Sequence, residues 1–151
     1  MILAHKLMRM IEAHAQPLAE TLEAKLARSE RCKSYSRVTP EEMKMLAGGI
    51  YANLGEWLVT RTEQDIESRY NIIGARRAEQ GIPVSELVWC IVLVKENLWD
   101  YLRENENLEN ASQVFGELEL TQMVDQFFDR AMYYAVRGYE RVREMGLAAK
   151  G

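Results

Sequence analysis

The chain has 151 residues, of which 48% are hydrophobic and 28% are charged, and its formal net charge is −4 at pH 7. This length predicts one domain with a real core over residues 1–151, and the composition excludes a disordered chain. The acidic balance argues against nucleic acid as a partner, and no apolar run approaches the roughly 20 residues of a membrane-spanning helix. Because the N-terminus has no signal-peptide pattern and cysteines are few, a reducing cytoplasm is the expected compartment.

The first predicted helix covers about Ile2 to Arg28, because its apolar residues mostly recur at spacings of three and four. Pro17 has no N–H and crowds the preceding turn, which predicts a break near Ala15 and two abutting helices. The next segment, residues 29–38, is polar and aperiodic, and we predict a loop there.

The second helical region is predicted to begin at Thr39 and Pro40. Thr39 can cap the helix, Pro40 suits the first helical position, and Glu42 can reach back to the N–H of the cap. An apolar stripe carries the helix onward: Met43, Leu46, Ile50, Leu54, Trp57 and Leu58. Three glycines interrupt the helix, and we interpret them as points where another backbone comes close: Gly48, Gly49 and Gly55.

A bend is predicted at residues 60–62, where Thr62 and Asp65 form a second capping-box pattern. The third helix should then cover Glu63 to Gln80. Its inward residues are expected to be Ile66, Tyr70, Ile73 and Ala78.

A corner between two helices is predicted at the Gly-Ile-Pro sequence of residues 81–83. Gly81 suits the left-handed residue that ends a helix, and Pro83 suits the start of the next one. Arg77 before the corner and Glu86 after it could pair across it. We expect these four residues to form a corner that is structural first and a candidate functional site second.

The most apolar stretch of the chain is the run of eight consecutive apolar residues from Leu87 to Val94. It lies in a helix predicted from Pro83 or Val84 to Arg103. A buried strand is the competing interpretation, but the helical spacing continues through Leu98, Tyr101 and Leu102. Such a run would be costly to leave on a surface, so it predicts the central core helix.

The last predicted helix covers about Gln113 to Met145, after a loop at residues 105–112, with a possible bend near Gly116 or Thr121. Its later apolar residues alternate spacings of four and three, which is close to a heptad seam. They form a candidate dimer or output face: Phe128, Met132, Ala135, Tyr139 and Val142. Ordinary core packing explains this pattern equally well. No region alternates like a strand, which predicts an all-α fold of about five to six helices.

The residue inventory offers no catalytic or metal-binding constellation. Both histidines, His5 and His14, would lie on different faces of a helix, and no Glu-x-x-His, HExxH or CxxC pattern occurs. Four arginines recur at near-helical spacing and could form an anion-binding face: Arg61, Arg69, Arg76 and Arg77. Local ion pairs are the simpler interpretation, with these partners: Glu63, Asp65, Glu67 and Glu79.

One candidate ligand pocket is suggested by aromatic residues around the predicted central helix: Trp57, Tyr70, Trp89 and Trp99. Core filling explains these residues equally well. We therefore expect no enzyme activity, no cofactor and no metal, and we keep an apolar small-molecule-binding protein as the alternative function.

Residues 74–86, GARRAEQGIPVSE, resemble the N-terminal domain of the RsbR and RsbRD type of RsbT co-antagonist proteins. The similarity extends over most of the chain, from about Leu3 to Tyr139. It rests on these further patterns: Tyr51-x-x-Leu54-Gly55-x-Trp57-Leu58, Tyr70-x-x-x-Gly74-x-x-Arg77, Leu118-Glu119-Leu120 and Phe127-Phe128-Asp129-Arg130.

The resemblance implies an all-helical, globin-like fold without haem, a homodimer, and a sensory input to an output domain in stress signalling. In relatives, that output is a STAS domain that gates release of a switch kinase, or a transcription-regulator or kinase module. No STAS domain follows here, so we expect either a stand-alone sensor or part of a longer protein. The resemblance implies no catalytic residues and no general ligand.

Overall fold

Helices make up the regular structure in the part of the chain that the computed structural model describes, residues 2–105 and 111–150. In chain order the segments are α1 (Ile2–Ala13), α2 (Ala15–Arg28), the 3-10 helix η1 (Glu30–Arg37), α3 (Pro40–Ala52), the π-helical turn η2 (Glu56–Thr60), α4 (Glu63–Glu79), α5 (Val84–Glu104) and α6 (Ala111–Lys150). The all-α prediction is confirmed over these residues. The expected five to six helices were too few, because two short helices replace a predicted loop and part of a predicted helix.

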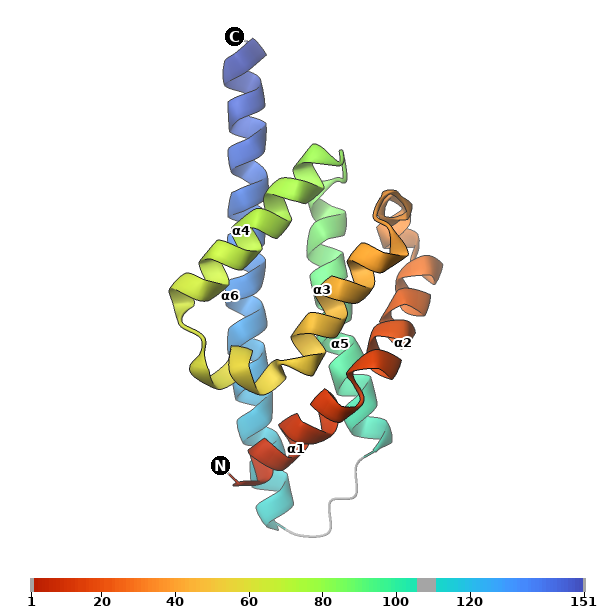
Figure 1. Ribbon diagram of the computed structural model, residues 1–151, viewed down its shortest axis with the longest axis vertical. Coiled ribbons are helices and arrows are strands. Elements are labelled where there is room, and N and C mark those ends of the chain that lie inside the picture. Colours follow the sequence, from red (N-terminus) through yellow and green to blue (C-terminus); the bar gives the residue numbers. More distant parts are fainter. Residues whose placement is uncertain (1, 106–110, 151) are drawn as a thin grey trace.

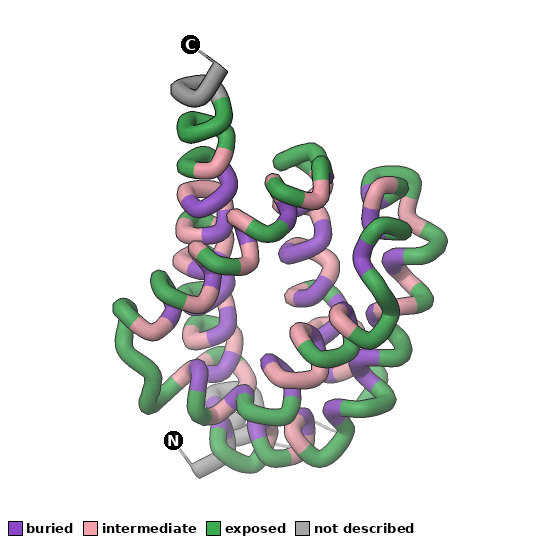
Figure 2. The backbone as a smooth tube through the Cα atoms, turned by 45° about the horizontal axis from the view of Figure 1, so that its top comes forward, coloured by how far each residue is buried: buried purple, intermediate pink, exposed green. Residues whose placement is uncertain are grey.

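The helices enclose one hydrophobic core, whose buried residues extend along the chain from Ala4 to Tyr139. α6 runs along one side of the molecule and α4 crosses it, while α2 and α3 lie toward the opposite side and α1 leads from α6 across to α2 (Figure 1). Toward its C-terminal end α6 extends past the other helices, and residues 143–146 are exposed (Figure 2). Within the described residues, no helix combines the length and apolar character needed to cross a membrane.

The predicted break near Ala15 is confirmed at His14, which separates α1 from α2 with φ −111° and ψ 22°. Pro17 is the third residue of α2, a position whose N–H has no partner within a helix. The Leu18 N–H still reaches the His14 carbonyl at 3.0 Å, so α2 begins immediately after the break.

The segment predicted as a loop is instead the 3-10 helix η1, so that prediction was wrong. Ser29 precedes it and accepts a hydrogen bond from the Arg31 N–H. Cys32 and Tyr35 of η1 are buried, as is Val38 just after it, and this spacing of three is the repeat of a 3-10 helix. Cys32 itself has a non-helical φ of −131° and ψ of 32°, which kinks the segment. A constant spacing of three differs from the three-and-four alternation of an α-helix, so the segment looked aperiodic.

Thr39 caps α3 as predicted, accepting a hydrogen bond from the Glu42 N–H at 3.1 Å, and Pro40 is the first residue. The predicted return bond from Glu42 was wrong, because its carboxylate pairs with two arginines of α4. The glycine interpretation was also wrong here. A Cβ added at Gly48, Gly49 or Gly55 would have nearest neighbours at 3.9, 3.6 and 3.5 Å, all of them side-chain atoms at ordinary contact distance.

The bend between α3 and α4 is confirmed, with η2 immediately before it. The Arg61 N–H donates to the Glu56 carbonyl at 2.9 Å, a bond that spans five residues. Thr62 and Asp65 then form the predicted capping box, with bonds of 3.2 and 2.9 Å.

α5 is helical as predicted, but its apolar run is less buried than expected. Leu87, Cys90, Ile91 and Val94 are buried, whereas the residues between them are only partly covered. The run therefore presents one face to the core and another toward the surface.

A buried polar network joins α2, α3 and α5. Asn97 is 1% exposed, and its amide donates to the Leu18 carbonyl at 2.9 Å and to the Tyr51 hydroxyl at 3.2 Å. Tyr51 in turn donates to the Val94 carbonyl at 2.9 Å. Lys25 donates to the Asn97 side-chain oxygen at 2.8 Å, so the amide is bonded at both ends. A buried network that is satisfied in this way holds the three helices in one arrangement.

A close backbone contact lies where α4 crosses α6. A Cβ added to Gly74 would stand 1.8 Å from the Ala135 carbonyl oxygen, and one added to Gly138 would stand 2.1 Å from the Asn71 carbonyl oxygen. Each helix therefore contributes one glycine to the crossing, and any side chain at either position would force the helices apart.

α6 is one helix from Ala111 to Lys150, with no interruption at Gly116 or Thr121. The loop predicted at residues 105–112 falls mostly outside the described residues, since 106–110 are not described.

Candidate functional site

The corner between α4 and α5 has the geometry that its sequence predicts. Gly81 has a φ of 73°, in the left-handed region. Its N–H bonds the Ala78 carbonyl at 3.0 Å, and the Ile82 N–H bonds the Arg77 carbonyl at 3.1 Å. These two bonds form a Schellman motif, which ends α4 and satisfies its last carbonyl groups.

Arg77 lies just before the corner, but its predicted ion pair with Glu86 was wrong. The side chain is 2% exposed and donates to the Glu42 carboxylate at 3.1 Å and to the Gln80 side-chain oxygen at 3.0 Å. Its guanidinium carbon also lies 5.7 Å from the centre of the Tyr35 ring. Arg77 therefore joins α4 to α3 and η1 rather than bridging the corner.

Glu42 is shared by two arginines, since Arg76 also pairs with it. These hydrogen bonds, led by the one from Arg76, hold the pKa of the Glu42 carboxyl below its usual range. The candidate anion-binding face is therefore occupied in part from within the chain. Arg61 pairs with Glu56 at 3.2 Å, and Arg69 lies 5.1 Å from the centre of the Trp57 ring.

The predicted local partners of those arginines take other roles. Glu63 pairs with Arg130 of α6 at 3.1 Å, and Asp65 completes the capping box of α4. The prediction of ion pairs was right in kind, but the partners come mainly from α3 and the η2 segment.

η1 is attached to the corner and to the first turns of α5 through Ser34, Arg37 and Arg31. Ser34 donates to the two carboxylate oxygens of Glu86, from its N–H at 2.8 Å and from its hydroxyl at 2.7 Å. Arg37 donates to the Gly81 carbonyl at 2.8 Å. The Arg31 guanidinium lies 4.3 Å from the centre of the Trp89 ring. The real partner of Glu86 is thus η1, a segment with no α-helical or strand periodicity in the sequence.

α6 is attached to the other side of the same corner. The buried Tyr139 hydroxyl donates to the Ile82 carbonyl at 2.7 Å. Because a buried carbonyl without a partner costs free energy, this bond favours one position of α6 against the corner. The corner is therefore bonded to both η1 and α6.

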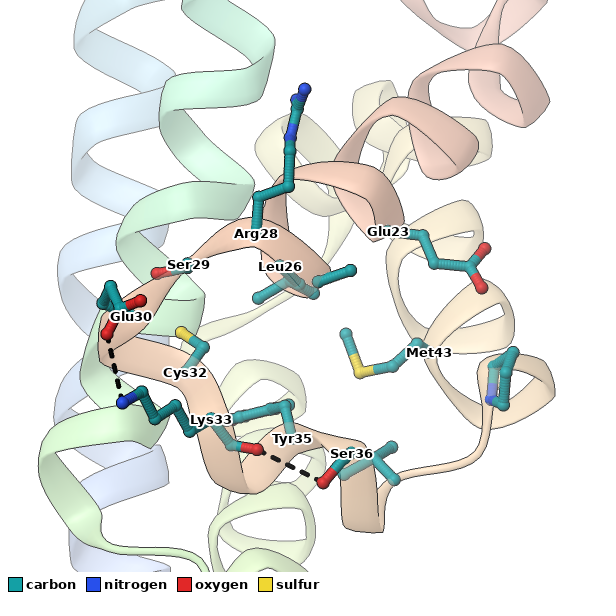
Figure 3. A pocket seen from close by; sticks show the side chains of 13 residues that line it. Glu23, Leu26, Arg28, Ser29, Glu30, Cys32, Lys33, Tyr35, Ser36 and Met43 are labelled. Carbon is teal, nitrogen blue, oxygen red and sulfur yellow. Dashed lines mark hydrogen bonds and ion pairs between the residues drawn. The ribbon is translucent and has the colours of Figure 1, made fainter.

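A cavity of about 530 Å³ lies between the end of α2, η1 and the start of α3. Figure 3 shows Leu26 above it, Tyr35 below it, and Cys32 and Met43 facing each other across it. Its size falls within the range of small-molecule sites. Burial raises the pKa of the Cys32 thiol, so the sulfur is protonated at neutral pH and acts as an apolar wall rather than as a nucleophile.

The four aromatic residues predicted to line a ligand pocket do not share one cavity among those described. Trp57 and Tyr70 both contact Phe127, with ring centres 6.0 and 5.9 Å away. Trp57 also lines a smaller cavity of about 180 Å³ beside α6, which none of the other three lines. Trp89 lies next to η1, and Trp99 is partly buried on α5. Ligand binding at these residues stays a prediction.

The predicted dimer or output face divides into two parts. Phe128, Ala135 and Tyr139 belong to the core of this chain, and Met132 is packed against it. Packing within the chain explains these four residues, and their side chains are therefore not available to contact a partner. Val142 is partly exposed, and it begins the part of α6 that could still meet a second copy.

The residues that complete the corner were missed by sequence reasoning. Cys32, Ser34 and Tyr35 lie in a segment without α-helical spacing, and only the 3-10 spacing could have revealed that η1 has a buried face. Nothing in the sequence indicates that Glu42, at a helix start, is the partner of an arginine 35 residues away.

The side chains around the corner join helices to one another and do not form a set of reacting groups. Among the described residues, no group of three or more His, Cys, Asp or Glu side chains could hold a metal ion. The fold and this corner define an all-helical domain in which several segments meet at one turn.

Comparison with protein families gives that class a specific identity. Residues 16–150 match the RsbT co-antagonist protein rsbRD N-terminal domain, and the chain belongs to this family. The resemblance seen in the sequence is thereby confirmed. The family is one of stress-signalling sensory domains, not of enzymes. No significant match was found among curated proteins or among solved structures.

Proposed function

We propose that this protein is a dimeric cytoplasmic input domain that passes a stress signal to an output partner through changed helix packing. Its family supports the sensory role, and the corner supports the route. The observation that carries the proposal is the hydrogen bond from Tyr139 of α6 to the Ile82 carbonyl. Through it, a shift of the corner would displace the helix that extends furthest from the core.

The crossing of α4 over α6 adds a second reason. At Gly74 and Gly138 the two backbones are in direct contact, with no side chain between them that could adjust. Packed backbones move together or separate, and they do not deform gradually. A movement of α4 at the corner is therefore expected to turn or shift α6 as a whole.

The output face is proposed to begin where α6 leaves the core, at Val142 and Met145. Met145 is 72% exposed, and a large apolar side chain at an exposed helix end is suited to a partner. A second copy is the proposed partner, with these residues near a two-fold axis. The globin-like arrangement implied by the resemblance stays a prediction.

Size-exclusion chromatography with light scattering at micromolar concentration tests the dimer. The wild-type protein should have the mass of two chains, and Met145→Lys should shift it toward the monomer, because a charge would be buried at the contact. Met45→Lys is the matched control, since Met45 is a 77% exposed methionine on α3. A monomeric wild-type protein would refute the dimer, and equal masses for both variants would refute the contact at Met145.

A further inference from the structure

We propose that the cavity beneath η1 binds a small, uncharged molecule that carries an aromatic ring. The cavity is distinct from the aromatic residues that the sequence suggested. The role of this cavity as an input site rests on the proposed sensory function. The binding of a ligand there does not depend on that function.

Polar and charged side chains line part of the cavity, and the apolar part of its wall includes two sulfur atoms. Leu26, Cys32, Tyr35 and Met43 are all buried, and the Cys32 and Met43 sulfur atoms lie on opposite sides of the space (Figure 3). Sulfur is polarisable and makes favourable contacts with aromatic rings. A flat ring between the two sulfur atoms would use this feature of the walls, which an aliphatic chain would not.

Three hydrogen-bonding side chains around the cavity already have partners. The Ser36 hydroxyl donates to the Lys33 carbonyl, and Ser29 accepts from the Arg31 N–H. The Tyr35 hydroxyl lies on the far side of its ring, beside Cys90 and Arg77. A strongly polar ligand would lose its bonds to water and find few replacements here.

The charges at the mouth of the cavity compensate each other. Lys33 pairs with Glu30 at 3.1 Å, and Glu23 lies 3.9 Å from Lys44. The Arg28 guanidinium points away from the cavity (Figure 3). An ionised ligand would therefore meet no free charge of opposite sign pointing into the cavity, which favours an uncharged one.

The same segment forms the cavity wall and the attachment to the corner. Cys32 and Tyr35 face the cavity, while Ser34 and Arg37 bond Glu86 and the Gly81 carbonyl. A ring inserted behind η1 would shift or stiffen η1 against the corner. The ligand would contact η1 more favourably in one position than in another. A ligand can shift a conformational equilibrium only through such a difference in binding.

A titration followed by two-dimensional NMR of the full chain tests the site, with indole as the uncharged probe. Indole should shift the amide signals of Cys32, Tyr35 and Met43 saturably. Indole-3-acetate and tryptamine, which carry opposite charges, should bind at least about tenfold more weakly. Absence of saturable shifts with indole would overturn the site, and tighter binding of either charged probe would overturn the ligand class.

Ala27→Phe blocks the cavity from an exposed position on α2 that lines it. It should weaken indole binding by about tenfold or more. Ala24→Phe, also exposed on α2 but outside the cavity, should bind indole as the wild type does. Ser36→Phe places a phenylalanine side chain in the cavity from η1, and it serves as the blocking variant if Ala27→Phe does not fold. Equal binding by the blocked and control variants would overturn the proposal, while the mass of the protein independently tests the dimer.

Discussion

Gly74 of α4 and Ala135 of α6 meet through their backbones, because a single added carbon on Gly74 would lie 1.8 Å from the Ala135 carbonyl oxygen. The reciprocal contact, Gly138 against Asn71, lies on the same crossing. Two helices that each contribute a glycine form a joint whose spacing is fixed by backbone atoms. Such a joint transmits displacement better than one filled with flexible side chains.

Gly74→Ala should destabilise the protein by about 3 kcal/mol, because α4 and α6 must separate to admit the methyl group. Chemical denaturation at neutral pH measures this loss. Gly48→Ala is the matched control, since its added carbon would lie 3.9 Å from the nearest side-chain atom. There the higher helix propensity of alanine should raise stability by up to about 1 kcal/mol. Similar losses at both glycines would contradict the backbone joint.

Arg77→Ala should lower the free energy of unfolding by about 3 kcal/mol. It removes a side chain that is 2% exposed, and both Glu42 and Gln80 lose the hydrogen bond that Arg77 donates to them. Arg76→Ala removes the other partner of the same carboxylate, but its side chain is 57% exposed. That variant should lose about 1 kcal/mol or less. Thermal denaturation of both variants checks the contrast. Equal losses would show that burial of Arg77 is not what makes it important.

Glu42 should make stability depend on pH on the acid side of neutrality. Its pKa is lowered in the folded protein, first by the hydrogen bond from Arg76. A lowered carboxyl pKa adds stability above the unfolded value, about 4.3, and this contribution is lost as pH falls through the folded value. Glu42→Gln should therefore be about 1 kcal/mol less stable than the wild type at pH 7.

That difference should disappear as the pH falls below the lowered pKa of Glu42, since the wild-type carboxyl is then protonated and resembles the amide. Urea denaturation of the two proteins at a series of pH values from 7 downward measures this. Glu41→Gln, at the exposed neighbouring position, is the control and should change little at any pH. A constant gap between Glu42→Gln and the wild type across the series would contradict the ion-pair origin of the effect.

Much of the fold follows from local rules that the sequence displays. The break before Pro17, the caps at Thr39 and Thr62, and the left-handed Gly81 are all confirmed. Each depends on bonds within one or two turns, so the residues that decide it are neighbours in the chain.

The contacts that join distant segments could not be predicted in the same way. Arg77 meets Glu42 rather than Glu86. The glycines in close backbone contact are Gly74 and Gly138 rather than Gly48, Gly49 and Gly55. Such pairings depend on how the helices cross, and periodicity identifies a buried face without identifying its partner. η1 was missed because its three-residue repeat gives no α-helical or strand signal.

We expect η1, the corner and α6 to behave as one unit, and a double-mutant cycle tests this most directly. Ser34→Ala removes the hydroxyl bond from η1 to Glu86, and Tyr139→Phe removes the bond from α6 to the Ile82 carbonyl. The two side chains bond different residues on either side of the corner. Asn53→Ala, which removes an exposed side-chain bond to the Gly49 carbonyl at the end of α3, pairs with Tyr139→Phe as the control cycle.

Free energies of unfolding from urea denaturation give the coupling in each cycle. We predict a coupling above about 0.5 kcal/mol for Ser34→Ala with Tyr139→Phe, and additive losses for the control pair. Additive losses in both cycles, within about 0.3 kcal/mol, would contradict the account, because η1 and α6 would then contact the corner independently.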